Sequence, residues 1–251
     1  MSDRERLLAE VRREMPVAIG SYRLPAQGVG LVIIDEVNGF CTPGAGNLAP
    51  KAPDDRIQAM VEETDRIARA FLARRWPVFV TLDTHEPDRP EPPYPPHCIR
   101  GTGEENLVPK LAWLEGESEA TLLRKDCINS FVGAMEPAPV RGAHGTFVNR
   151  FVDWATVHGL ESVVTVGICT DICVMDFVLT LLSARNHGLV GGLRDVVVYE
   201  PACSTYDLPR GVVDQLGLPE TAAHPRDLAH HLGLYFMASR GAILADRLEG
   251  L

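Results

Sequence analysis

The chain has 251 residues, of which 45% are hydrophobic and 23% are charged, and its formal net charge is -10 at pH 7. This composition is typical of a globular protein that can bury a sizeable core. The acidic net charge argues against nucleic acid or an anionic membrane as the main partner, and no run of about 18 apolar residues is present to cross a membrane.

Periodicity and turn residues predict elements in the following order. We expect a helix over residues 3–14, a strand over 28–35, a loop over 38–50, a helix over 54–75, a strand over 77–82, a proline-rich loop over 86–96 and a helix over 104–112. A strand over 120–124, a helix over 146–158, a strand over 162–168, a helix over 173–186, a strand over 195–199 and helices over 223–237 and 242–248 follow.

The predicted strands are short, nearly continuous apolar runs, which is typical of strands that are covered on both faces. Their alternation with helices predicts an α/β fold, with an open, mainly parallel sheet and helices on both faces. No repeat or linker interrupts the pattern. We therefore expect one domain over residues 1–251, in which residues 1–27 form an N-terminal helical extension.

Reactive side chains stand at the ends of four predicted strands. Asp35 follows the first strand, Asp83 the second and Lys125 the third, while Cys169 and Cys173 follow the fourth. In an open parallel sheet, ligands bind just beyond the carboxyl ends of the strands. If these strands are neighbours, the side chains meet in one crevice, as in a catalytic site. A structural salt bridge between Asp35 and Lys125 is the alternative, because a buried charge needs a partner.

Cys173 opens the helix that follows the fourth strand, which makes it a candidate nucleophile. The partial positive charge and free N–H groups of a helix N-terminus favour a thiolate and could hold an oxyanion. Asp35 could accept the thiol proton, and Lys125 could hold both charges in place. Two other interpretations stay open: a buried cysteine at a strand–helix corner, and a metal-binding pair of Cys169 and Cys173.

A candidate metal site lies near the end of the second strand. Asp83 and His85 are two residues apart and point to the same side of an extended chain, and His97 follows beyond the proline-rich loop. A carboxylate with two imidazoles suits zinc, iron or manganese. Three protein ligands leave positions open for water or substrate, as in catalytic metal sites. An acidic residue of the loop between the histidines is a candidate for a further ligand.

The remaining cysteines and histidines carry weaker signals. The N-terminus is charged and has no apolar signal core, so we expect free thiols in a reducing, cytoplasmic compartment. The cysteines outside the candidate site are expected to be buried core residues: Cys41, Cys98, Cys127 and Cys203. The C-terminal histidines are expected to be packing or surface groups: His224, His230 and His231.

Several of these residues lie in longer segments with a recognisable order. The segments are IDEVNGFC (34–41), GAGNLAP (44–50), DTH (83–85), PPYPPHCI (92–99), RKDCIN (124–129), GICTDICV (167–174), SARN (183–186), DVVVY (195–199), AHP (223–225) and HHLGLY (230–235). Together they resemble the isochorismatase-like cysteine hydrolases and, among them, the plant-type branch of the nicotinamidases. The likeness extends over residues 28–245.

The resemblance implies the three-layer α/β/α fold of that family and the hydrolysis of nicotinamide to nicotinate and ammonia through a cysteine thioester, a step of NAD salvage. It implies that Asp35 is the general base, Lys125 the stabilising cation and Cys173 the nucleophile. It also implies a non-proline cis peptide before Cys169, with the N–H groups of Cys169 and Cys173 as the oxyanion hole.

The resemblance further implies a divalent metal held by Asp83, His85 and His97. The pyridine nitrogen of the substrate would lie near that metal, and Phe40 and Tyr94 would sandwich the ring.

The fourth protein ligand varies in this family among His, Glu and Ser. No histidine stands between His85 and His97, so Glu91 is the candidate by likeness to the plant-type loop. We expect zinc, with iron and manganese as alternatives. Dimers or larger assemblies are usual in the family, so a homo-oligomer is also expected.

Other functions remain open at this point. A related cysteine amidase that acts on pyrazinamide, maleamate or an N-carbamoyl compound would keep the same three catalytic residues. An isochorismatase proper would need no cysteine nucleophile. A non-catalytic homologue used as a binding protein would have no need for buried Asp35, Lys125 and Cys173 together.

Overall fold

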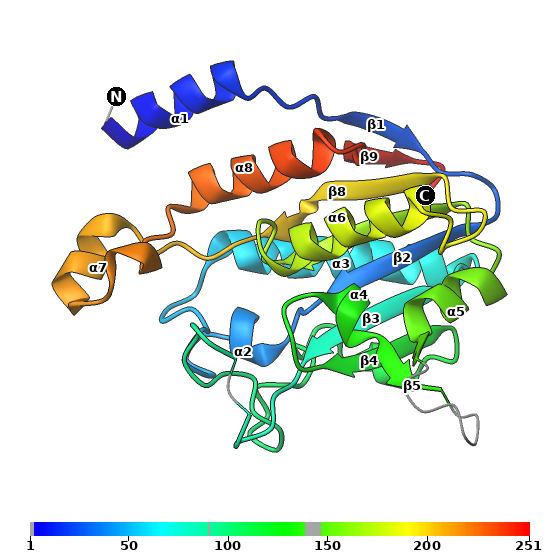
Figure 1. Ribbon diagram of the computed structural model, residues 1–251, viewed down its shortest axis with the longest axis horizontal. Helices are drawn as coiled ribbons and strands as arrows, with labels where there is room; N and C mark the ends of the chain where they lie inside the picture. The colour runs from blue at the N-terminus through cyan, green and yellow to red at the C-terminus, as the bar shows by residue number, and fades with distance from the viewer. Residues whose placement is uncertain (1–2, 90, 139–146) are drawn as a thin grey trace.

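The computed structural model describes residues 3–89, 91–138 and 147–251, and its centre is a seven-stranded sheet (Figure 1). The strand order is β1-β9-β8-β7-β2-β3-β4, and all neighbours are parallel. The strands are β1 (Gly20–Arg23), β2 (Val29–Ile34), β3 (Val78–Asp83), β4 (Ala120–Lys125), β7 (Ser162–Ile168), β8 (Asp195–Ser204) and β9 (Ile243–Glu249). A separate antiparallel hairpin consists of β5 (Met135–Pro137) and β6 (Phe147–Asn149).

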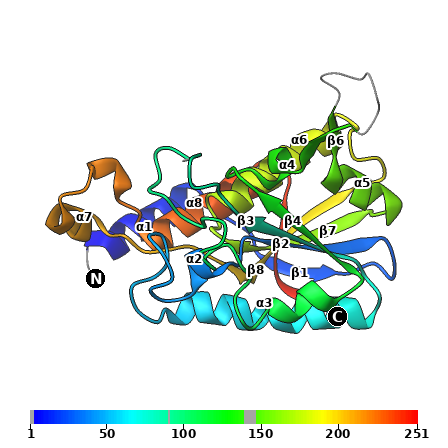
Figure 2. The same ribbon diagram turned by 90° about the horizontal axis from the view of Figure 1, so that it is seen from below.

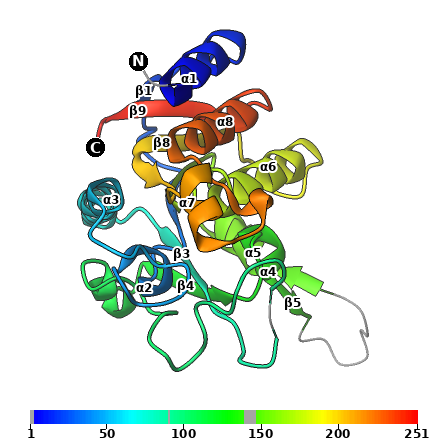
Figure 3. The ribbon, with the colours of Figure 1, turned by 90° about the vertical axis from the view of Figure 1, so that its left-hand side faces the viewer.

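Helices cover both faces of this sheet. They are α1 (Asp3–Glu14), α2 (Asn38–Cys41), α3 (Asp55–Ala73), α4 (Ser130–Gly133), α5 (Arg150–Val157), α6 (Cys173–Asn186), α7 (Arg210–Leu216) and α8 (Arg226–Ala238), with 3-10 helices η1 (Ala112–Gly116) and η2 (Glu220–Ala222). Helix α3 lies on one face, and α4, α5, α6 and α8 lie on the other (Figures 2 and 3). The predicted open α/β sheet with helices on both faces is confirmed. None of the described helices combines the length and apolar composition that a membrane crossing requires.

The long helix α3 shows how local sequence determines an element. The Asp54 side chain accepts hydrogen bonds from the N–H groups of Arg56 and Ile57 and so caps the first turn. The buried residues recur at helical spacing and face the sheet: Ile57, Met60, Val61, Thr64, Ile67, Ala68 and Phe71. The helix therefore begins and ends close to the predicted limits.

Gly167 determines how closely β2 and β7 approach at their carboxyl ends. Its φ is +124°, and a Cβ atom there would lie 2.1 Å from the carbonyl oxygen of Ile34. Only glycine fits such a position. As a result, the residues that follow Ile34 and Ile168 lie side by side at the same edge of the sheet.

Residues 104–112 do not form the predicted helix. They form turns, because the Glu105 carboxylate accepts hydrogen bonds from the N–H groups of Gly101 and Gly103 at 2.7 and 2.9 Å. The Gly39 N–H also donates to the carbonyl of Glu104 at 2.8 Å. The two Glu105 bonds close turns with the residues just before the segment, and the Gly39 bond ties the segment to the chain that follows β2.

Two other predictions need correction near the sheet edges. The predicted closing helix over 242–248 is strand β9, which pairs with β8 and β1. Short apolar runs do not distinguish a strand from a buried helix by periodicity alone. Residues 1–27 likewise contain strand β1 as well as α1.

The predicted helix over 146–158 begins later than expected. Residues 147–149 belong to β6, and α5 starts at Arg150 with Asn149 as its N-cap. The Asn149 side chain accepts from the N–H groups of Phe151 and Val152. Thr146 lies outside the described residues.

Candidate active site

Four neighbouring parallel strands bring the predicted residues to one edge of the sheet. Asp35 follows β2, while Asp83 and Lys125 end β3 and β4 and are direct partners in the sheet register. Cys173 follows β7 and is the first residue of α6. Since the strand order places β4, β3, β2 and β7 side by side, all four side chains share this edge. The predicted convergence is therefore present.

Lys125 is the electrostatic centre of this group. Its Nζ lies 2.8 Å from Asp35 Oδ2 and 2.9 Å from Asp83 Oδ1, and it donates to the carbonyl of Cys127 at 2.9 Å. The three charged side chains are buried. The ion pair of Lys125 with Asp83 was not predicted from the sequence, and it links the candidate catalytic residues to the candidate metal ligands.

The two carboxylates beside Lys125 differ in their proton affinity. Burial raises the pKa of Asp35, and the positive charge of Lys125 offsets this only in part because Asp83 adds negative charge nearby. Burial also acts on Asp83, but Lys125 and hydrogen bonds from His85 and His97 hold its pKa well below the ordinary value. Two carboxyl groups with pKa values pushed apart are typical of a base next to a permanently ionised partner.

Asp35 retains an oxygen that can take up a proton. Its Oδ1 accepts a hydrogen bond from the Thr81 hydroxyl at 2.9 Å. Its Oδ2 is buried in the ion pair with Lys125 and has no other donor among the described residues. The backbone of Asp35 is in the left-handed region, with φ +55°, and its N–H donates to the Thr81 carbonyl. Thr81 therefore fixes both the side chain and the backbone of Asp35.

The surroundings of the Cys173 thiol favour its protonated form. Burial raises its pKa well above the ordinary value, Lys125 lowers it, and Asp35 and Asp83 raise it further. The sequence predicts that the helix N-terminus favours a thiolate, whereas burial and the adjacent carboxylates act in the opposite direction. A nucleophilic Cys173 consequently needs a base that removes its proton during attack.

The turn before α6 presents two unused N–H groups. The peptide bond between Ile168 and Cys169 is cis, as the resemblance implied. The Cys169 carbonyl accepts from the N–H groups of Ile172 and Val174 at 3.0 and 3.1 Å. The N–H groups of Cys169 and Cys173 have no such acceptor in the part of the chain that the structure describes. Both are thus free to bind an oxygen of a ligand.

Asp83, His85 and His97 form a cluster suited to a metal ion. The Nε2 atoms of His85 and His97 lie 3.0 and 3.2 Å from Asp83 Oδ2, and all three side chains are buried. The candidate ligand atoms lie within 4.8 Å of one another. His97 Nδ1 lies 2.8 Å from the Pro95 carbonyl, which can only accept, so Nδ1 carries a proton and Nε2 is the ring nitrogen that faces the cluster. The donor set therefore fits a divalent transition metal.

Glu91 lies beside this cluster. Its Oε2 is 3.7 Å from His85 Nε2 and 3.8 Å from His97 Nε2. Its Oε1 accepts from the Ile128 N–H at 2.8 Å, which orients the carboxylate. Glu91 therefore borders the cluster that the other three residues form.

The two predicted aromatic residues flank the same region. The rings of Phe40 and Tyr94 lie 5.7 and 6.0 Å from the His97 ring, and both side chains are half-buried. Burial raises the pKa of Tyr94, and the nearby Cys173 and Cys169 raise it further. Tyr94 thus lies near both the metal cluster and the candidate nucleophile.

The other cysteines are free and distributed through the interior. Cys41, Cys98 and Cys203 are buried, and Cys127 is half-buried. Among the C-terminal histidines, His231 is buried and its Nε2 lies 2.9 Å from the Met15 carbonyl, as expected of a packing group.

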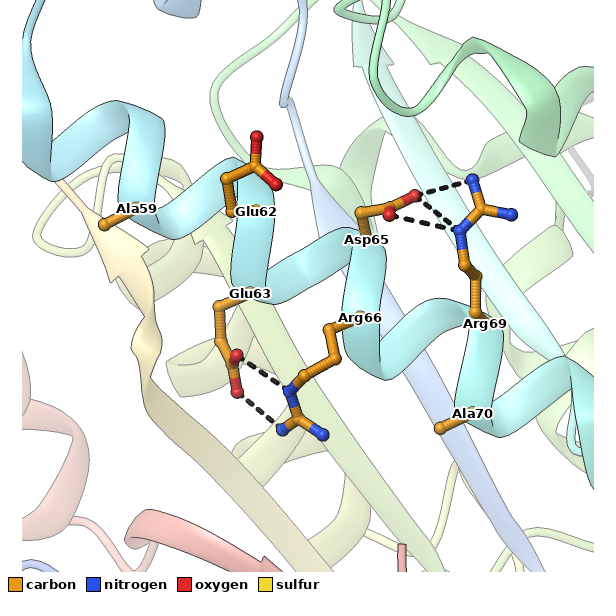
Figure 4. Close-up of a pocket in the computed structure, with 7 residues that line it drawn as sticks. All are labelled: Ala59, Glu62, Glu63, Asp65, Arg66, Arg69 and Ala70. Atoms are coloured by element: carbon orange, nitrogen blue, oxygen red, sulfur yellow. Dashed lines mark hydrogen bonds and ion pairs between the residues drawn. The ribbon is translucent and has the colours of Figure 1, made fainter.

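One hollow on the protein surface lies apart from the candidate active site. It lies on the exposed side of α3 and is lined by Ala59, Glu62, Glu63, Asp65, Arg66, Arg69 and Ala70 (Figure 4). Ion pairs within the helix, Glu63 with Arg66 at 2.6 Å and Asp65 with Arg69 at 3.0 Å, satisfy most of its charge. It contains none of the strand-end residues described above.

Comparison with known proteins places this arrangement in a family. Residues 29–215 match the isochorismatase domain. Nicotinamidase 1 of Arabidopsis thaliana is 48% identical over 251 residues, which cover 99% of each protein. Nicotinamidase from Bacillus subtilis has a TM-score of 0.62 at 21% identity, over 88% of this chain and 100% of that one. N-carbamoylsarcosine amidase from Thermoplasma acidophilum has a TM-score of 0.59 at 21% identity, over 89% of this chain and 100% of that one.

The two solved structures share the fold at low identity, whereas the Arabidopsis protein is similar in sequence over its whole length. The chain belongs to the isochorismatase family, in the branch that contains the plant nicotinamidase.

Proposed function

We propose that this protein hydrolyses nicotinamide to nicotinate and ammonia through a thioester on Cys173. The observation that carries the proposal is the buried cluster in which Asp35, Lys125 and Cys173 meet next to Asp83 and its two histidines. Full-length similarity to a plant nicotinamidase supports the substrate.

The first half of the reaction forms the thioester. Asp35 accepts the Cys173 proton as the sulfur attacks the amide carbon, and the carbonyl oxygen becomes an oxyanion. The free N–H groups of Cys169 and Cys173 stabilise that oxyanion. Asp35 then returns the proton to the amide nitrogen, the carbon–nitrogen bond breaks, and ammonia leaves.

The second half releases the acid. Asp35 takes a proton from water as the water oxygen attacks the thioester carbon. The same N–H groups hold the second oxyanion. When the carbon–sulfur bond breaks, Asp35 returns the proton to the Cys173 sulfur and the starting state is restored. Lys125 keeps Asp35 oriented throughout and keeps Asp83 ionised.

Asp83, His85 and His97 would hold a divalent metal, with Glu91 as a further ligand; zinc suits this donor set, and iron and manganese are alternatives. When bound, such a metal supplies a positive centre that orients the pyridine ring and polarises water. Phe40 and Tyr94, whose rings both lie beside the His97 ring, would enclose that pyridine ring between them.

Replacing His97 with alanine should weaken metal binding at least about 100-fold, because even outer-sphere partners of a metal site contribute up to that factor. Metal per protein chain after dialysis, measured by plasma mass spectrometry over a range of free zinc, tests this. His187→Ala, which removes an exposed histidine at the end of α6, is the matched control. Unchanged stoichiometry and affinity in the His97 variant would remove this residue from the metal site.

A substrate panel tests the proposed function directly. Ammonia release should be fastest with nicotinamide. Pyrazinamide, maleamate and N-carbamoyl compounds should be hydrolysed more slowly. The aromatic pair Phe40 and Tyr94 favours a flat ring over an open-chain amide. A higher kcat/KM for maleamate or an N-carbamoyl compound would reassign the substrate while keeping the nucleophile. Absence of ammonia release from every amide would support a non-catalytic protein.

We also propose that the protein acts in NAD salvage in the cytoplasm, since nicotinate is a precursor of the pyridine nucleotides and the free cysteines suit a reducing compartment.

A further inference from the structure

Residues from the C-terminal part of the chain contact the turn that ends at the nucleophile. We call residues 169–173 the nucleophile turn. His224 Nε2 lies 2.8 Å from Asp171 Oδ2, and His230 Nδ1 lies 2.9 Å from the Thr170 hydroxyl. A Cβ atom at Gly233 would lie 2.8 Å from Asp171 Cα, so the backbone of α8 rests against the turn. Figure 1 shows α7 and its flanking segments at the same end of the sheet as α2.

The contact between His224 and Asp171 has the features of a partly buried ion pair. Burial would raise the pKa of Asp171, but the hydrogen bond and charge of His224 outweigh it and the pKa is lowered, with a weaker contribution from Thr205. Burial would lower the pKa of His224, and Asp171 raises it overall. Asp171 Oδ1 is buried and has no hydrogen bond among the described residues. His224 is therefore the main anchor of this carboxylate.

His224 is itself fixed from two sides. Its Nδ1 lies 2.9 Å from the Tyr206 carbonyl, and its ring stacks on the Tyr206 ring with centroids 3.9 Å apart and an interplanar angle of 13°. Backbone hydrogen bonds between Leu208 and His224 hold the two chain segments together. Because both ring nitrogens face acceptors, a doubly protonated ring satisfies both contacts.

Tyr206 connects this arrangement to the substrate region. Burial and Asp171 raise the pKa of the Cys169 thiol, and the backbone N–H of Tyr206 is among the groups that oppose this rise. Burial raises the pKa of Tyr206, and the nearby Cys169 and Tyr94 raise it further. The stacked pair of Tyr206 and His224 therefore borders the same space as Tyr94 and the nucleophile turn.

We propose that His224 is a positioning residue for the reaction: through Asp171 it fixes the nucleophile turn, and with it the Cys169 and Cys173 N–H groups that stabilise the oxyanion. This role rests on the proposed function. Small displacements of oxyanion donors weaken transition-state stabilisation more than substrate binding. Loss of the contact between His224 and Asp171 therefore lowers kcat and leaves KM nearly unchanged.

Two variants of similar size separate the contacts of His224. The amide of His224→Gln can reach the position of Nε2 and donate to Asp171. The amide of His224→Asn can reach only the position of Nδ1, so it keeps the bond to the Tyr206 carbonyl and loses Asp171. We expect the Asn variant to lose about 10- to 100-fold in kcat, as misplacement of a catalytic group by about 1 Å does. The Gln variant should recover most of the wild-type kcat, and His187→Ala should behave as wild type.

The rate at which iodoacetamide alkylates Cys173 distinguishes a positioning role from a general structural defect, because a general defect would change this rate. Attack on that saturated carbon forms no oxyanion, so its rate reports the thiol and its access but not the N–H donors. We expect alkylation of the Asn variant within about twofold of wild type despite its lower kcat, since the oxyanion donors matter only for acyl transfer.

Three results would overturn the positioning role: wild-type kcat in the Asn variant, equal losses of kcat in the Asn and Gln variants, or a parallel fall of kcat and alkylation rate. These outcomes differ from a failure of the proposed function, which would show as a wild-type protein that does not hydrolyse nicotinamide. If the wild type prefers another amide of the panel, the variants are compared on that amide.

Discussion

Replacing Cys173 with alanine should reduce ammonia release from nicotinamide to the detection limit, a loss of about 10^6-fold if it matches the removal of other covalent nucleophiles. The physical reason is that Asp35 then has no thiol to deprotonate, and no thioester forms. The fold should persist, because the side chain is small and contributes a single sulfur atom to the buried start of α6. Ammonia release under saturating nicotinamide, with circular dichroism and thermal unfolding, measures both statements.

Cys203→Ala is the matched control for this variant. Cys203 is also buried and free, and it lies in β8 opposite Gly167 in the sheet register. Its loss should cost about 1 kcal/mol of stability and leave turnover unchanged. Normal turnover by the Cys173 variant would refute the nucleophile assignment. Equal loss in both variants would instead point to damage of the sheet.

The position of the site could be predicted from the sequence because charged residues stand at the ends of three predicted strands. Apolar runs end at Asp35, Asp83 and Lys125, and parallel strands direct their carboxyl ends to one edge. The order of the strands could not be predicted in the same way, since it depends on pairing between distant segments. The direct pairing of Asp83 with Lys125, and hence their ion pair, follows from that order.

The surroundings that raise the pKa of Cys173 were not predictable for a different reason. The sequence shows that the residue opens a helix, and helix N-termini favour thiolates. It does not show that the sulfur is buried beside Asp35 and Asp83, which raise its pKa. Helix position alone therefore identified the residue but not the burial and the charges that raise its pKa.

The contact between His224 and Asp171 left no signal in residue spacing. The two residues are 53 positions apart, and His224 belongs to a short irregular segment between η2 and α8. A lone histidine in such a segment is more often a packing or surface group, which is the role that the sequence suggested. The contact forms in the folded chain because α8 packs against the nucleophile turn and His224 lies just before α8.

Replacing Asp35 with asparagine should lower kcat by about 10^3-fold or more, within the range of general-base removal. Asparagine has the same shape and can still accept the Thr81 hydrogen bond, but it cannot take the proton of Cys173. Lys125 would keep Asp83 and the Cys127 carbonyl as partners, so we expect the fold and the metal site to persist. Asp246→Asn, at an exposed position of β9, is the matched control. Steady-state kcat, metal content and thermal unfolding are the measurements.

The wild-type pH profile provides an independent check on the same residue. Asp35 must be ionised to accept the thiol proton, and burial raises its pKa above the ordinary value despite Lys125. Activity should therefore be lost, as pH falls, at a pH above the ordinary aspartate value of about 3.9. The kcat/KM profile of the free enzyme reports this titration. If Asp35→Asn kept its turnover, or if kcat/KM of the wild type stayed constant down to about pH 4, another group would have to remove the proton. In that case the buried ion pair of Asp35 with Lys125 would be structural: it would stabilise the fold and take no part in proton transfer from Cys173.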